Sequence, residues 1–420
     1  MLRSRLGRVV GGEVLGAFGV QKMHGGAAVR CLSSTPVYIA GQGMVPITRN
    51  KGATLKEMGA AAITAAMADA GVDPKRVGAV YVGNMMSGML SDQQHMGPYL
   101  ATAAGLVGVE ATTIEACCGG GGAALRMGYM AVASGMHETV VVAGVEQMTH
   151  RDRDVVTKGL ATASDWTSEG ATGATFVSLN GDLMALYMAK YGIKAEQFAP
   201  FPVNAHRNAL TSEHASLRKP VTEEAYVASR FLTDPVRLLD ASPTCDGGAA
   251  VVISSSRQLS QRPGNVFVRI AGSGAATDIL AVHQRPEPLH LHAVEKSLAE
   301  ALRRARLTHD AVDIFELHDA YSIMATLCLE SAGFVPAGEG TAFAQDGNIA
   351  LRGVLPVATF GGLKARGHPV GATGVYQAAE MLLQLHGRAG DNQVRGAEVG
   401  VIQNIGGAGA SVYTHVLVRE

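Results

Sequence analysis

The chain has 420 residues, of which 47% are hydrophobic and 17% are charged, so it is long enough to bury a large core. Its formal net charge is −1 at pH 7 and only 5% of its residues are aromatic, which excludes the basic, aromatic-rich face typical of nucleic-acid-binding proteins. The apolar runs are too short to cross a bilayer, and the 5 cysteines have neither disulfide-framework nor zinc-site spacing, so neither a membrane span nor a metal site is expected.

The first 35 residues differ in composition from the rest of the chain. They are rich in arginine and contain a single acid, Glu13, which is typical of a mitochondrial transit peptide. The stretch RCLSS (residues 30–34) resembles a processing site with cleavage after Leu32. We therefore expect a transit peptide over residues 1–35 and a location in the mitochondrial matrix; an N-terminal extension without a targeting role is the alternative.

Short Val- and Ile-rich runs alternate with Ala-rich helical segments from Val37 onward. The pattern predicts a helix over residues 55–71, with Gly71 at its C-terminal end. Alternation of strands and helices is typical of a layered α/β fold. The predicted strands cover residues 37–43, 79–84, 139–144, 313–319 and 399–404.

The stretch TIEACCGGGGAALRMG (residues 113–128) places Cys117 and Cys118 directly before four glycines and a helical pattern. Unpaired backbone N–H groups at a helix start lower the pKa of a cysteine and make it a better nucleophile. The glycines would let a thioester carbonyl approach the backbone, where N–H groups could stabilise an oxyanion. The plain alternative is a small-residue turn whose thiols fill the core.

Two parts of the chain repeat the same order of elements on either side of a polar insertion rich in His and Arg. Residues 67–83 and 302–318 each read as a helix end, a short turn and a strand. This duplication places Cys118 and His368 at equivalent helix starts, which makes His368 a candidate base for the cysteine. We expect an N-terminal half over residues 36–145 and 246–262, an inserted domain over 146–245, and a C-terminal half over 263–420.

Five motifs occur in the order and spacing of the thiolase family, and the chain resembles archaeal-type and sterol-carrier-protein-type thiolases over residues 37–420. The resemblance implies two βαβ-rich halves that form a layered αβαβα core, with an inserted loop domain over coenzyme A. It also implies a homodimer or a dimer of dimers that acts on acyl-CoA thioesters without a separate cofactor. The motifs are VEQMT (145–149), SPTCDGGAAVV (242–252), ELHDAYS (316–322), GGLKARGHPVGATG (361–374) and QNIGGAGA (403–410).

The resemblance also implies roles for individual residues. Cys118 would accept the acyl group, and His368 would activate it and donate to the thioester oxygen together with His318. The backbone N–H groups of Cys118 and Gly406 would form a second oxyanion hole, whereas Cys117 would pack in the core. Charged residues of the insertion would either bind the CoA phosphates or form an ordinary solvated surface: Arg151, Arg153, Lys158, Arg207 and Lys219.

Two positions depart from the family pattern, and both concern its second cysteine. The family loop His-Asp-Cys-Phe reads HDAY at residues 318–321, so Ala320 stands in place of the cysteine. Asn404 occupies the other position at which thiolases carry that thiol. In the family this thiol is the general acid/base for the α-proton. Cys245 and Cys328 are poor substitutes by position.

Three functions therefore remain open. The first is thiolase-type acyl transfer, by thiolytic cleavage or Claisen condensation of 3-ketoacyl-CoA. The second is a decarboxylating, malonyl-type condensing enzyme or an acyl-CoA hydrolase, because loss of carbon dioxide forms the carbanion without a second thiol. The third is a catalytically weak, CoA-binding scaffold protein. Tyr321 stands where the family has Phe, and its hydroxyl could take over part of the proton transfer or could simply pack.

Overall fold

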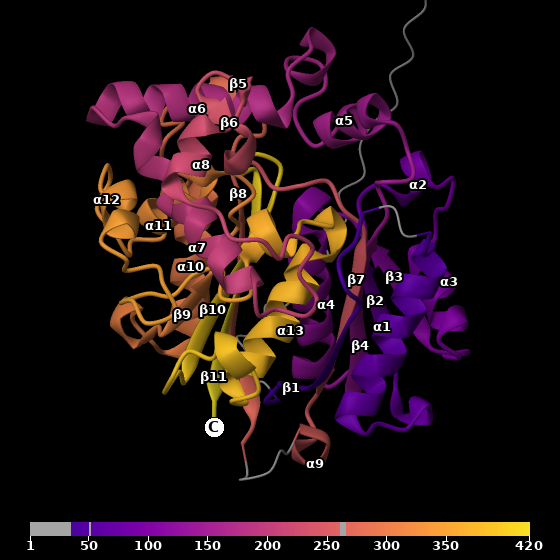
Figure 1. Ribbon diagram of the computed structural model, residues 1–420. Helices are drawn as coiled ribbons and strands as arrows, with labels where there is room; N and C mark the ends of the chain where they lie inside the picture. Colours follow the sequence, from indigo (N-terminus) through magenta and orange to yellow (C-terminus); the bar gives the residue numbers. More distant parts are fainter. Residues whose placement is uncertain (1–34, 50–51, 261–265) are drawn as a thin grey trace, which may run out of the picture. The chain divides into compact units, whose positions relative to one another are not determined.

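The computed structural model describes residues 35–49, 52–260 and 266–420 (Figure 1). The predicted transit peptide lies outside these residues except for Thr35, so the leader and its cleavage site remain predictions. Within the described ranges, no helix combines the length and the apolar character that a membrane span requires.

The N-terminal half contains five strands in the spatial order β3-β2-β4-β7-β1. Strand β2 runs parallel to both β3 and β4, whereas β7 runs antiparallel to β4 and to β1. The strands are β1 (Tyr38–Met44), β2 (Ala79–Gly83), β3 (Glu110–Ile114), β4 (Thr139–Glu146) and β7 (Gly247–Ser254).

The C-terminal half repeats this arrangement in the order β8-β11-β10-β9. Strands β9 and β10 are parallel, like β2 and β4, and β11 is antiparallel to both β10 and β8. The two halves join through a single register pair, Tyr38 with Arg269, so the strands form one continuous nine-stranded sheet. The predicted duplication is thus visible in the topology. The strands are β8 (Val268–Thr277), β9 (Ile314–Glu316), β10 (Val399–Gly406) and β11 (Ser411–Arg419).

The helices form three layers around the two halves of the sheet, as predicted for an αβαβα core (Figure 1). Helix α1 (Leu55–Ala70) covers the outer face of the N-terminal half, and α10 (His292–Ala305) covers that of the C-terminal half. Helices α4 (Gly120–Ala133) and α13 (Thr373–Leu385) pack against each other between the halves. The predicted end of α1 is confirmed, because Gly71 has a φ of 64°.

The run of glycines after Cys118 is explained by how closely α4 approaches α13. A Cβ atom on Gly121 would lie 2.8 Å from the backbone nitrogen of Gly374, and a Cβ on Gly374 would collide with the backbone of Gly122. Residues with side chains would therefore push the two helix starts apart. The close packing holds the two turns that precede these helices side by side.

The segment between β4 and β7 forms a mostly helical layer over one end of the sheet (Figure 1). Its sequence periodicity is weak, yet α6 has clear ends, a Thr175 capping box and Gly192 with a φ of 69°. Its elements are α5 (Arg153–Ala161), α6 (Phe176–Tyr191), α7 (Pro200–Ala209), α8 (Glu223–Ala228), β5 (Phe231–Thr233) and β6 (Val236–Arg237). The remaining helices are α2 (Ser87–Leu90), α3 (Met96–Ala103), α9 (Arg257–Ser260), α11 (Ser322–Ser331) and α12 (Gly340–Gln345).

Candidate active site

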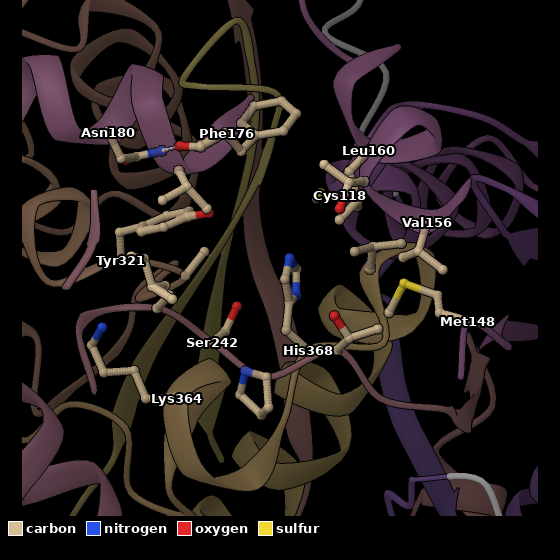
Figure 2. Close-up of a pocket in the computed structure, with 18 of the residues that line it drawn as sticks. Cys118, Met148, Val156, Leu160, Phe176, Asn180, Ser242, Tyr321, Lys364 and His368 are labelled. Atoms are coloured by element: carbon tan, nitrogen blue, oxygen red, sulfur yellow. Dashed lines mark hydrogen bonds between the residues drawn. The ribbon is translucent and has the colours of Figure 1, made fainter. Parts of the chain in front are cut away.

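A cavity of about 790 Å³ lies where the two halves meet the inserted segment. Cys118, His318 and His368 all line it, although they are far apart in the sequence. Figure 2 shows Cys118 and Tyr321 on opposite walls, with His368 between them. The structure therefore brings together the three residues that the family motifs single out as catalytic.

Cys118 lies in a 3₁₀ turn, Cys117–Gly119, that leads directly into α4. Cys117 has a φ of 52°, an unusual value for a residue with a side chain, and its N–H donates to Glu115 Oε1 at 2.6 Å. Cys118 is buried, whereas Cys117 is only half-buried, so the prediction that Cys117 packs in the core is wrong. The left-handed turn separates the environments of the two thiols.

The thiol of Cys118 does not have the lowered pKa that its helix-start position predicts. Burial, followed by the nearby Cys117 and Glu146 groups, raises its pKa above the ordinary cysteine value. The helix-start N–H groups do not outweigh the loss of solvation. Cys118 is therefore a neutral thiol and needs a base to become a nucleophile.

His368 is oriented as such a base by two hydrogen bonds. Its Nδ1 lies 2.7 Å from Thr373 Oγ1, and the Thr373 hydroxyl donates onward to the Pro369 carbonyl at 3.5 Å. The threonine oxygen is thus free to accept from Nδ1–H, which leaves Nε2 as a proton acceptor. Burial, then His318 and Arg366, hold the pKa of His368 well below its usual range, so the ring is neutral.

His318 has the complementary arrangement and presents a donor. Its Nδ1 accepts a long hydrogen bond, 3.4 Å, from the backbone N–H of Ile405, so its ring proton resides on Nε2. The ring centroids of His318 and His368 are 5.0 Å apart, at nearly perpendicular planes. Burial, and then the charge of Arg366, lower the pKa of His318 to about 3. The site therefore pairs a neutral acceptor with a neutral donor.

Glu146, at the end of β4, is a buried carboxyl group in the VEQMT motif, and no role was predicted for it from the sequence. It accepts hydrogen bonds from the backbone N–H groups of Met85, Met86 and Gly371, and from the Asn84 side chain. Burial raises its pKa to about 7, against the opposing effect of these donors. Through Gly371, Glu146 fixes the turn that follows His368.

Gly406, the second predicted oxyanion donor, packs against the Cys118 turn. A Cβ on Gly119 would lie 3.0 Å from the Gly406 nitrogen, so the two glycines touch. The neighbouring Gly407, not Gly406, lines the cavity. The amide of Gly406 is thus close to the turn that carries Cys118.

Only two of the five predicted CoA-binding residues, Arg151 and Arg153, line the cavity. The other three are exposed residues of α5, α7 and the loop after α7 that do not line the cavity: Lys158, Arg207 and Lys219. Sequence reasoning missed Arg49 and Arg230, two exposed arginines that line the same cavity from distant segments. Four arginines therefore line the cavity.

Comparisons with known proteins agree with this geometry. The model of the thiolase N-terminal domain matches residues 37–257, and that of the thiolase C-terminal domain-like region matches residues 274–419. The chain belongs to the thiolase family. The family and the α/β fold predicted from the motifs are thus confirmed.

Two similar relatives are archaeal acetyl-CoA acetyltransferases. The protein from Methanothermobacter thermautotrophicus is 42% identical over 359 residues, which cover 84% of this chain and 92% of the relative. The one from Methanocaldococcus jannaschii is 35% identical over 359 residues, 83% of this chain and 90% of the relative. A solved structure titled Ltp2-ChsH2(DUF35) aldolase shares the fold with a TM-score of 0.80 at 22% identity, covering 92% and 98% of the two chains.

Within residues 35–49, 52–260 and 266–420, one thiol lines this thiolase-family cavity. Of the cysteines in the described part of the chain, Cys118 alone lines it, while Cys245 and Cys328 are buried elsewhere. Ala320 lines the cavity as well. Asn404 is buried behind it, with Oδ1 accepting from the Gly122 N–H at 2.9 Å.

Proposed function

We propose that this chain is an acyl-CoA acyltransferase of the thiolase type, which cleaves or forms 3-ketoacyl-CoA through an acyl group on Cys118. The observation that carries the proposal is the meeting of Cys118, His318 and His368 on one cavity. The names of its archaeal relatives, acetyl-CoA acetyltransferase, support an acetyl-CoA substrate. The acyl-CoA is a substrate, and the proposal includes no separate cofactor.

The first step follows from the protonation states of the three groups. Because Cys118 is a neutral thiol, Nε2 of His368 takes its proton as the sulfur attacks the substrate carbonyl. The Nε2–H of His318 is a donor for the oxygen that becomes negative during the attack. The N–H groups of Cys118 and Gly406 remain candidates for the other oxyanion hole.

The arginines that line the cavity provide a binding site for CoA phosphates. Arg49, Arg151, Arg153 and Arg230 carry guanidinium groups, which bind phosphates in bidentate geometry. These residues come from the segment after β1 and from the insertion, so the insertion would cover the nucleotide. We also propose a homodimer and the mitochondrial matrix as its location, on the family resemblance and on the leader composition respectively.

The single thiol in the cavity favours a second candidate, a decarboxylating condensing enzyme. A malonyl thioester forms its carbanion by losing carbon dioxide, and two neutral histidines can stabilise the resulting enolate. This alternative would use Cys118, His318 and His368 without any second acid/base thiol.

Intact-protein mass spectrometry after exposure to acetoacetyl-CoA tests the proposal. We expect one acetyl group per chain, mapped to Cys118, which is lost in Cys118→Ala and kept in Cys117→Ala. Labelling confined to Cys117 or Cys245, or no labelling, would contradict acyl transfer through Cys118. Release of carbon dioxide from malonyl-CoA, without turnover of acetoacetyl-CoA, would favour the decarboxylating enzyme.

A further inference from the structure

Tyr321 presents its hydroxyl group to the cavity that contains Cys118. It precedes α11 and lines the cavity, and Figure 2 shows its ring entering from the wall opposite the cysteine. Within the described ranges, no side chain or backbone group forms a hydrogen bond with this hydroxyl. The phenol therefore faces the space that substrate would fill.

Four buried tyrosines have hydroxyl groups that donate hydrogen bonds within the protein. The hydroxyl of Tyr81 donates to Glu110, that of Tyr187 to Glu330, and that of Tyr226 to Asp240. The hydroxyl of Tyr376 donates to the Val45 carbonyl at 2.7 Å. Buried tyrosine hydroxyls usually find a partner. Tyr321 differs from them because it is half-buried and lines the cavity, so its hydroxyl is available to a group of the bound substrate.

The surroundings of Tyr321 keep it a proton donor. Burial, and then the proximity of Cys118, raise the pKa of its phenol above the ordinary value. The other titratable groups on the cavity walls near it are His318 and His368, both neutral, and the buried Lys364. Lys364 donates to the Asp240 carbonyl, so it already has one protein acceptor.

We propose that Tyr321 transfers the proton at the α-carbon, in place of the thiol that is absent at Ala320. The inference rests on the proposed acyl transfer through Cys118 and adds a catalytic residue to it. Ala320 precedes Tyr321, and both residues line the cavity that contains Cys118.

In thiolysis the atoms and protons balance as follows. His368 takes the Cys118 proton, the sulfur bonds to C3 of the 3-ketoacyl-CoA, and the C2–C3 bond breaks with its electron pair remaining on C2. Tyr321 gives its proton to C2, which releases acetyl-CoA and leaves a phenolate. Free CoA then gives its thiol proton to the phenolate and attacks the acyl-cysteine. The released Cys118 thiolate recovers its proton from His368.

Tyr321→Phe tests the proposal because it removes one hydroxyl and keeps the ring. Transfer of acetyl from acetyl-CoA to Cys118 needs no α-proton step, so its rate should remain within about threefold of wild type. Exchange of the acetyl methyl protons with solvent deuterium, and thiolysis of acetoacetyl-CoA, should each fall by about 10²- to 10⁴-fold. Adding Ala320→Cys to Tyr321→Phe should restore exchange.

Tyr413→Phe is the matched control. Tyr413 also lies beside the Cys117–Gly119 turn, with its ring within 3.3 Å of a Cβ built on Gly119, but it does not line the cavity. Its removal should leave both rates unchanged. Exchange at the wild-type rate in Tyr321→Phe, or an equal loss of acetylation and exchange, would overturn the role of Tyr321. A wild-type protein that never acetylates Cys118 would overturn the proposed function itself.

Discussion

The backbone N–H of His368 donates a hydrogen bond to the Sγ atom of Cys245 at 3.1 Å. Cys245 is fully buried, and burial raises its pKa to about 12, so the sulfur remains a neutral thiol. Cys328 is likewise buried beside the backbone of His318, which lowers the pKa of its thiol against the larger effect of burial. The backbone of each candidate catalytic histidine therefore lies next to a buried, neutral cysteine. These cysteines hold the backbone in place and are not second nucleophiles.

Replacing Cys245 should affect the chemistry of Cys118 without touching the substrate. We expect Cys245→Ala to slow acetylation of Cys118 by roughly ten- to a hundredfold, because the segment carrying His368 loses an anchor. The KM for acetyl-CoA should change little. Cys245→Ser, which keeps an acceptor, should recover most of the rate. Rapid-quench labelling measures both variants, and an unchanged rate in Cys245→Ala would show that the contact does not position His368.

The stability of the protein should depend on pH through His318. Its pKa is about 3 in the folded protein and about 6.5 when unfolded, so the unfolded state binds more protons below pH 6.5. The contribution of His318 to the unfolding free energy is thus fully present above pH 6.5 and is lost as the pH falls toward 3. Urea unfolding at several pH values should show a smaller acid loss for His318→Gln than for wild type. Parallel curves would contradict the buried, neutral state of His318.

Restoring the family thiol should speed the α-proton step. In wild type we expect exchange of the acetyl methyl protons to be slower than acetylation of Cys118, because the raised pKa of Tyr321 leaves little phenolate to accept the α-proton. Ala320→Cys should increase exchange and condensation together, by about tenfold or more. Deuterium incorporation followed by NMR measures this. Fast exchange in wild type that the substitution leaves unchanged would mean that another group supplies the proton.

Two basic residues on α5 allow a test of whether CoA binds to the cavity arginines or is attracted by surface charge in general. Arg153 and Lys158 both belong to α5, but only Arg153 lines the cavity. Arg153→Ala should raise the dissociation constant of CoA several-fold at low salt, and less at high salt. Lys158→Ala, the matched control, should leave it unchanged. Calorimetric titration of each variant with CoA measures both dissociation constants. Equal increases in the two variants would indicate general charge attraction and not binding in the cavity.

The N-terminal leader makes a prediction that needs no structure. Given its arginine-rich, acid-poor composition, the mature protein isolated from cells should begin directly after Leu32. N-terminal sequencing and the location of a C-terminally tagged protein test this together. An intact Met1 on a cytosolic protein would contradict the targeting role.

Sequence patterns identify the strands whose residues favour a sheet on their own. The Val-rich runs around Val80, Val141 and Val401 were predicted correctly as β2, β4 and β10. Strand β8, with the sequence VRIAGSGAAT, has little intrinsic strand preference. It becomes a strand because Gly272 and Gly274 let the backbone of α10 pack directly on it.

The candidate site was predictable where one motif contains the residue and its neighbours. Cys118, His318 and His368 each lie in such a motif, and the cavity joins them. Glu146 lies in the VEQMT motif, but no role was predicted for it because its N–H partners come from segments about 60 and 225 residues away. The pKa of Cys118 was predicted to be lowered, but burial raises it. How deeply the turn is buried depends on the packing of distant segments, which a local sequence pattern does not reveal.

The contact between Gly121 and Gly374 has an evolutionary consequence. The duplicated halves place the candidate nucleophile before one helix and the candidate base before the other, and these glycines fix how far apart the helices stand. A substitution that adds a side chain at either glycine would push the two helices apart. It would thereby both weaken the core packing and separate the candidate nucleophile from the candidate base. Sequence variation should therefore accumulate in the insertion long before it reaches these two helix starts.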